Sequence, residues 1–359
     1  MKATVCRPGE LGLAEVEAWR SMHALDPQAS PFLSPEFALA AGRCRSDVRV
    51  AIFEEAAESV GFWAFTVNHM RAAGPVAPGF SDCQGIVHNE RFTWNSAHIL
   101  AACALNGWAF DHLIASQALS LGTSSTFTRC CIVDLTDGWD NYFAWGSRTH
   151  KSLFKQMRRN HRRIQNDLGN VAFQEHLGYG KLLPEILRLK SAQCRRNGWK
   201  DPFSDGWARD MLVDLAETVA PNLAGVTSTL HIGGRLAACD FSLRGRTVQA
   251  GWIKAFDQEF SRYSPGLVIW PFWCQSAVDA GVRYLHLGEG KEQYKWKLAN
   301  DEAQLASGFL RGCGARGALF ALRHRPHRTV EQLFERYPTA EQAAERAIHR
   351  LRSLRHQTR

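Results

Sequence analysis

Apolar residues in the second half of the chain recur in short runs that are separated by glycine, proline and polar residues. Two runs with the periodicity of strands, residues 226–232 and 236–243, are joined by Gly233-Gly234, a strong signal for a two-residue hairpin. The order then continues with a strand over 247–256, an apolar helix that starts at Ser264-Pro265 and ends at Gly281, and a short strand over 284–287.

The first half repeats this order without residue identity. Ser34-Pro35 opens a short helix, and two strands are predicted over 48–53 and 60–67. After a loop rich in glycine and proline, a helix is predicted over 92–106 and a strand over 108–114. Two similar α/β units therefore explain the chain length better than one large core.

A basic segment lies between the two halves. Leu153, Met157, Ile164 and Leu168 fall at helical spacing and cations occupy the other faces, which predicts an amphipathic helix that ends near Gly169. Two more helices are expected over 183–194 and 205–219.

The net charge comes from two local patches. The 359 residues carry 43 Lys and Arg against 35 Asp and Glu, a formal charge of +8. Residues 148–163 hold seven cations and no acid, and residues 311–359 hold eleven arginines against four glutamates. The remainder is net acidic, which weakens a nucleic-acid function for the whole protein and leaves the patches to be explained.

Composition favours an ordinary globular protein. Apolar residues make up 45% and charged residues 22% of the chain, and no run approaches the roughly 18 apolar residues of a membrane span. The start of the sequence lacks the apolar stretch of a signal peptide, so we expect a cytoplasmic protein. The ten cysteines form no Cys-x-x-Cys pair and the histidines do not cluster, so we expect reduced thiols and no metal site.

The start of the helix at Ser264 is a candidate anion site. Its free N–H groups and positive dipole end attract anions, and Arg262 adds a charge. Since Pro265 has no N–H, the donors would be Gly266, Leu267 and Val268. The alternative is that these residues only form a favourable helix start and bind no anion.

Two further features suggest acid–base chemistry. Glycines flank Glu289 at a strand end, and Tyr294 and Lys295 follow closely; the alternative is a polar loop. Asp240 interrupts an apolar strand, on the face opposite Cys239 and Phe241. If that face lines a cleft, Asp240 is a candidate base, and if it meets solvent, Asp240 is an ordinary surface residue.

Residues of about 30–310 resemble the CelD/BcsL-type acyltransferases of the GNAT superfamily, which are associated with cellulose and other exopolysaccharide biosynthesis. The resemblance rests on an ordered set of motifs: Pro31–Phe37, Lys155–Arg163, Arg196–Trp199, Gly234–Ala238, Phe256-Asp257, Tyr263–Gly266 and Gly288–Lys295. This chain has His286 where such proteins often have an acidic residue.

The resemblance implies an α/β (α+β) fold of two GNAT-like units in tandem, each with a mixed, mostly antiparallel sheet flanked by helices. The units would span 1–145, without a donor site, and 146–312, with the acyltransferase site, followed by a basic helical tail over 313–359. The co-substrate would be acetyl-CoA or another acyl-CoA, without a metal, and the acceptor a sugar or a small amine or alcohol.

The resemblance also implies roles for the site residues. The pyrophosphate of the donor would bind at 262–268, with the thioester along Gly251, Trp252 and Ile253. Direct transfer would need a proton acceptor, Glu289 or Asp240, and Tyr294 would protonate the leaving thiolate.

Two other functions stay open at this stage. A Fem-like aminoacyl transferase would use charged tRNA, whose phosphates the basic helix over 148–163 would contact. A non-catalytic GNAT-like module would bind a partner or an anionic membrane surface through the same helix.

Overall fold

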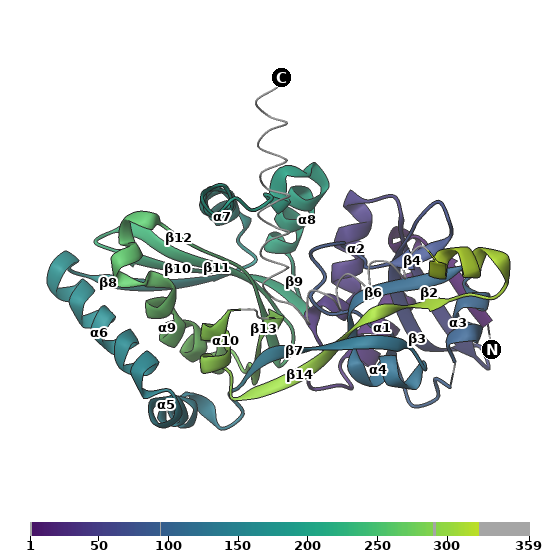
Figure 1. Ribbon diagram of the computed structural model, residues 1–359, viewed down its shortest axis with the longest axis horizontal. Helices are drawn as coiled ribbons and strands as arrows, with labels where there is room; N and C mark the ends of the chain where they lie inside the picture. The colour runs from purple at the N-terminus through teal and green to yellow at the C-terminus, as the bar shows by residue number, and fades with distance from the viewer. Residues whose placement is uncertain (1, 94, 290–291, 323–359) are drawn as a thin grey trace, which may run out of the picture.

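The computed structural model describes residues 2–93, 95–289 and 292–322, and its fold is mixed α/β (Figure 1). Most of the predicted tail, from residue 323 onward, lies outside the described residues. The elements of the first half are β1 (Lys2–Cys6), α1 (Leu13–His23), α2 (Pro35–Cys44), β2 (Val48–Glu55), β3 (Glu58–Val67), β4 (Ala72–Gly74), β5 (Val87–His88), α3 (Ser96–Ala102), β6 (Gly107–Ile114), α4 (Ala115–Ser120) and β7 (Ser124–Asp134).

The second half repeats this order of elements. Its members are α5 (Gly138–Thr149), α6 (Lys151–Leu168), β8 (Val171–Leu177), α7 (Leu183–Asn197), α8 (Gly206–Glu217), β9 (Val219–Ala220), β10 (Leu223–Ile232), β11 (Arg235–Arg244), β12 (Val248–Phe256), the 3₁₀ helix η5 (Gln258–Tyr263), α9 (Pro265–Asp279), β13 (Tyr284–Glu289), α10 (Gln293–Leu298) and β14 (Asp301–Arg311). The predicted strands and helices of this half are confirmed to within a few residues.

Local sequence signals explain several elements. Gly233 and Gly234 both have positive φ, as the tight hairpin between β10 and β11 requires. The helix predicted over 92–106 is shorter than expected, because Asn95 accepts a hydrogen bond from the His98 N–H and so caps α3 at Ser96. Leu168 ends α6 on the surface, whereas Leu153, Met157 and Ile164 are buried as expected.

In the described residues, one 14-stranded sheet, mostly antiparallel, runs through both halves. Twelve of its strands follow the order β1-β2-β3-β4-β6-β14-β7-β13-β12-β11-β10-β8, and the short strands β5 and β9 pair with β3 and β10 beside this path. The strand that ends each half in the sequence pairs with strands of the other half in the sheet. β7 pairs with β13, β14 pairs with β6, and β7 and β14 pair with each other at the centre (Figure 1). Each half therefore completes its sheet only with a strand from the other.

Helices cover both faces of the second half. α7 and α8 lie on one face, where they share a core with α2, and α6 and α9 lie on the other (Figure 1). No helix among the described residues has the length and apolar character that a bilayer crossing demands.

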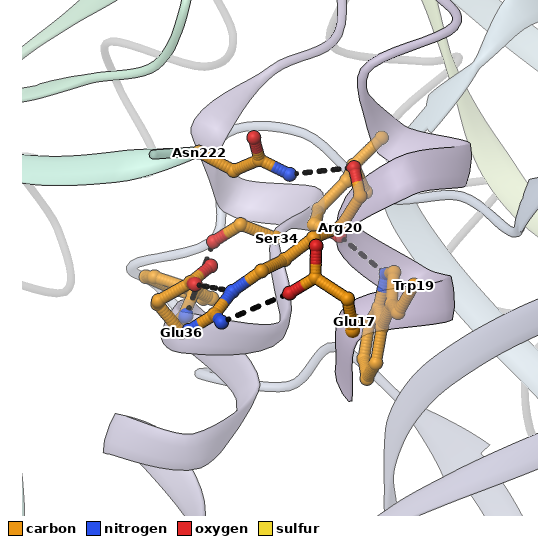
Figure 2. Close-up of polar contacts among 8 residues, drawn as sticks. Glu17, Trp19, Arg20, Ser34, Glu36 and Asn222 are labelled. Atoms are coloured by element: carbon orange, nitrogen blue, oxygen red, sulfur yellow. Dashed lines mark hydrogen bonds and ion pairs between the residues drawn. The ribbon is translucent and has the colours of Figure 1, made fainter. Parts of the chain in front are cut away.

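Polar contacts join the two halves beside α2. The buried Glu36 carboxylate accepts a hydrogen bond of 2.7 Å from Arg20, and the Asn222 amide, in the loop before β10, donates to the Arg20 carbonyl at 2.8 Å (Figure 2). This junction holds α1 against the loop before β10 of the second half.

Candidate active site

The site begins where two parallel strands separate. The register of β12 and β13 pairs Val248 with Tyr284 and ends at Ala250 with His286. On its other side, β12 is bulged against β11, since Phe241 faces Ile253 and Ser242 faces Gly251, which leaves Trp252 as the extra residue. The remainder of β12 therefore borders an opening in the sheet, with Gly251, Trp252 and Ile253 at its start.

A cavity of about 520 Å³ occupies this opening. It is bounded by β11, β12, α7, α9, β13 and α10. Of the residues expected at the site, Asp240, Ser264, Gly266, Leu267, Tyr294 and Lys295 line it, whereas Gly251, Trp252, Ile253, Arg262, Val268 and Glu289 do not.

The start of α9 offers fewer donors than expected. The N–H groups of Leu267 and Val268 both donate to the Ser264 carbonyl, at 2.9 and 3.2 Å, so they are not the free donors that the sequence predicts. Ser264 is the N-cap residue of α9 and adopts a left-handed conformation. Among the described residues the Gly266 N–H has no such acceptor, and no atom lies within 4 Å of the position of an added Cβ. Gly266 is therefore the open donor at this helix end.

Arg262 and Val268 lie beside the helix start but face other groups. The Arg262 guanidinium donates to the Tyr263 hydroxyl at 2.5 Å and stacks on its ring, and that hydroxyl in turn donates to Asp167 on α6. Val268 is buried in the core between α9 and the sheet. Neither side chain faces the cavity.

Asp240 faces the cavity, in a buried environment. Cys239 and Phe241 pack toward α7 and Ala238 toward α9, so the face predicted for Asp240 is confirmed and it is not the solvent face. Burial raises the pKa of the Asp240 carboxyl, and the Lys254 Nζ lies 3.3 Å from its Oδ2. Neither carboxylate oxygen has a hydrogen bond of good geometry among the described residues.

Lys254 is held over aromatic rings. Its Nζ lies 4.0 Å from the centroid of the Trp273 ring, and the Trp273 Nε1 is buried with no hydrogen-bond partner in the described chain. Lys254, Trp270 and Trp273 all line the cavity. No pattern along the chain predicts this arrangement, because a lysine near a strand end and a tryptophan in an apolar helix are each common.

Tyr294 and Lys295 lie on α10 at another wall of the cavity. Partial burial raises the pKa of Tyr294 to about 12, so its hydroxyl is protonated at neutral pH. The Lys295 Nζ lies 3.1 Å from Glu292. The neighbouring Gly290 and Lys291 lie outside the described residues.

Glu289 lies in a second group of charges, contributed mostly by the first half. Its Oε2 is 3.5 Å from the Nε2 of His112 on β6, and the Nδ1 of His112 is 3.1 Å from Asp111. Burial lowers the pKa of His112, but these carboxylates outweigh it and raise the pKa to about 10. Burial also raises the pKa of nearby Asp82 to about 6.

Sequence reasoning missed this group. Asp111 and His112 interrupt the apolar strand β6, which is a weak signal, and their closeness to Glu289 depends on how the halves assemble.

Residues 151–296 match the family model described as acetyltransferase (GNAT) domain. The matched region lies in the second half of the chain, which therefore resembles a GNAT acetyltransferase domain. The matched GNAT region contains the cavity lining from Lys190 to Lys295 and stops two residues before Leu298. No curated protein matches this chain.

Solved structures share the fold over nearly the whole chain. The crystal structure of FemX aligns with a TM-score of 0.62 and 10% identity, covering 90% of this chain and 99% of FemX. The C-terminal domain (DUF2156) of a putative lysylphosphatidylglycerol synthetase from Agrobacterium fabrum aligns with a TM-score of 0.55 and 14% identity, covering 86% and 95%. These likenesses extend the shared architecture from the GNAT region to both halves.

Proposed function

We propose that this chain transfers an acyl group from an acyl-CoA to an amine or hydroxyl of a sugar or other small acceptor. The observation that carries the proposal is the cavity in the region that matches the GNAT model. It extends from the unpaired Gly266 N–H at the start of α9 to the place where β12 and β13 stop pairing. The donor site belongs to the predicted unit 146–312, and none is assigned to 1–145.

The residues present fit such a co-substrate. Gly266 offers an unpaired N–H in open space at a helix N-terminus, which suits a phosphate oxygen. The buried Trp273 Nε1 lacks a partner within the described residues, so the cavity holds a polar atom for a ligand to satisfy. When bound, the acyl-CoA supplies an activated thioester carbonyl.

This chain's own groups supply positioning and proton transfer. Asp240 is the proposed proton acceptor because it lines the cavity and its pKa is raised by burial. Glu289, which lies outside the cavity beside His112, is the alternative. Tyr294 lines the same cavity and its hydroxyl is protonated at neutral pH, so it is assigned to protonate the CoA thiolate that leaves. Lys295 places a positive charge beside Tyr294.

The test is transfer itself. The full chain is incubated with acetyl-CoA and a panel of amino sugars, sugars and small amines. The CoA thiol that is released is quantified, and the masses of the acceptors are determined by mass spectrometry. We expect thiol release that depends on one class of acceptor, together with an acetylated product. Acetyl-CoA that stays intact with every acceptor class would contradict the proposal.

A second candidate, aminoacyl transfer from charged tRNA, is favoured by one observation. The exposed side of α6 forms a shallow groove lined by Lys151, Lys155, Arg158, Arg159, Arg162 and Arg163. Asp167 is the acid that also lines it, 3.5 Å from Arg163. Such a row of cations suits a phosphate backbone.

Filter binding with tRNA at several salt concentrations separates the candidates. Aminoacyl transfer predicts tight, salt-dependent binding that Arg159→Glu with Arg162→Glu abolishes, and no need for acetyl-CoA. Sedimentation with anionic vesicles, carried out in parallel, detects a membrane-binding module. The acyl-CoA proposal predicts weak binding in both assays.

A further inference from the structure

The cavity carries one lysine whose charge is not balanced. Three lysines line it: Lys190, Lys254 and Lys295. Lys254 is paired with Asp240 at 3.3 Å and Lys295 with Glu292 at 3.1 Å. The Lys190 Nζ instead donates to the Lys254 main-chain carbonyl at 3.2 Å, and no carboxylate of the described residues lies within ion-pair distance.

Lys190 is also poorly solvated. It lies on α7, and burial lowers the pKa of its ammonium group. A half-buried cation without a counter-charge is costly, and the cost falls when an anion binds beside it. An anionic group of a ligand would therefore bind favourably beside Lys190.

A second polar group on the same face of α7 lacks a partner. Gln193, one turn after Lys190, also lines the cavity, and its Oε1 is buried with no hydrogen-bond donor among the described residues. Trp199 follows at the edge of the cavity with 56% of its surface exposed, which leaves a ring face available for stacking. A ligand that satisfies this wall has an anionic group, a hydroxyl or amino donor and a flat or sugar-like body.

The position of Lys190 distinguishes the acceptor from the donor. α7 packs on the sheet face opposite α9, as the separate cores on the two faces show (Figure 1). The phosphates of the acyl-CoA are assigned to the α9 end, at Gly266. The anion at Lys190 therefore belongs to the other substrate.

We propose that the acceptor is an anionic molecule whose carboxylate or phosphate pairs with Lys190 while a hydroxyl or amino group donates to Gln193 Oε1. This proposal rests on the proposed acyl transfer and adds the class of acceptor. A charge-assisted contact of this kind changes recognition by about 10- to 100-fold.

The experiment uses the full chain and matched acceptor pairs: glucosamine 6-phosphate with glucosamine, and glucuronate with glucose. We expect kcat/KM with acetyl-CoA to be at least about 10-fold higher for the charged member of one pair. Lys190→Met should remove that preference, Lys190→Arg should keep most of it, and Lys181→Met, at an exposed lysine outside the cavity, should leave it unchanged. In each variant the KM for acetyl-CoA should stay constant.

A binding measurement separates this proposal from the proposed function. The same four compounds are titrated without acetyl-CoA and followed by tryptophan fluorescence. Binding of a charged probe that weakens about 10-fold in Lys190→Met supports the anionic site even if no transfer occurs. Equal response to charged and neutral members, or an undiminished preference in Lys190→Met, overturns it while leaving acyl transfer standing.

Discussion

Two carboxylates compete for the role of proton acceptor, and their surroundings differ. Asp240 lies in the cavity beside Lys254, and Glu289 lies outside it beside His112. We expect Asp240→Asn to lower kcat by about 100-fold or more with little change in the KM for acetyl-CoA, and Glu289→Gln to lower it by less than about 10-fold. Steady-state kinetics and circular dichroism of both variants check this; the reverse order would transfer the role to Glu289.

His112 gives the stability a pH dependence. Its pKa is about 10 in the folded protein against an ordinary value of 6.5. The contribution is therefore fully present below pH 6.5 and is lost as the pH rises through 10. Since the partner carboxylates are partly exposed, we expect His112→Gln to cost about 1–2 kcal/mol at pH 6 and almost nothing above about pH 10, measured by urea unfolding. A cost that does not change between these pH values would contradict the ion contacts.

Among the helices and strands, α8 packs closely against β10. A Cβ at Gly225 would lie 2.2 Å from the Leu215 carbonyl oxygen of α8, a main-chain atom that cannot move independently. We expect Gly225→Ala to reduce the free energy of unfolding by about 3 kcal/mol or more. Gly206→Ala, at the start of α8 where no atom lies within 4 Å, is the control and should change it by less than about 1 kcal/mol.

Patterns local in sequence predicted the elements well, and contacts between distant segments account for what was missed. The Gly233-Gly234 hairpin, the start of α9 and the face of Asp240 follow from periodicity and turn chemistry. Lys190 and His112 come close to the other site residues only through tertiary packing. The spacing of residues along one strand or helix cannot predict such contacts. The free donors of α9 were overestimated because the Ser264 carbonyl accepts hydrogen bonds from the Leu267 and Val268 N–H groups in the first turn of the helix.

At the scale of the molecule, the exchanged strands couple the two halves. β14 brings Ala306, which is fully buried, into the core of the first half, and β7 brings Cys131 and Val133 into the core of the second. Neither half completes its part of the sheet alone, so we expect one cooperative unfolding transition in calorimetry. Two separated transitions would contradict the coupling.

A single substitution tests the same coupling. Ala306 lies on β14, the last described strand, so Ala306→Asp places a charge in the core of the first half. It should strongly accelerate amide exchange in the neighbouring strand β6. Gln304→Asp, exposed on the same strand, is the control and should leave exchange in β6 as it is.

Isothermal titration with acetyl-CoA, carried out on the wild type and two Gly266 variants, determines whether the α9 end of the cavity binds an acyl-CoA. Because the Gly266 N–H is unpaired and an added Cβ meets no atom, Gly266→Ala should bind like the wild type, whereas Gly266→Asp places a negative charge there and should weaken binding by about 10-fold or more. No binding to the wild type at millimolar acetyl-CoA, or equal affinity in all three proteins, would show that this end of the cavity does not bind the donor.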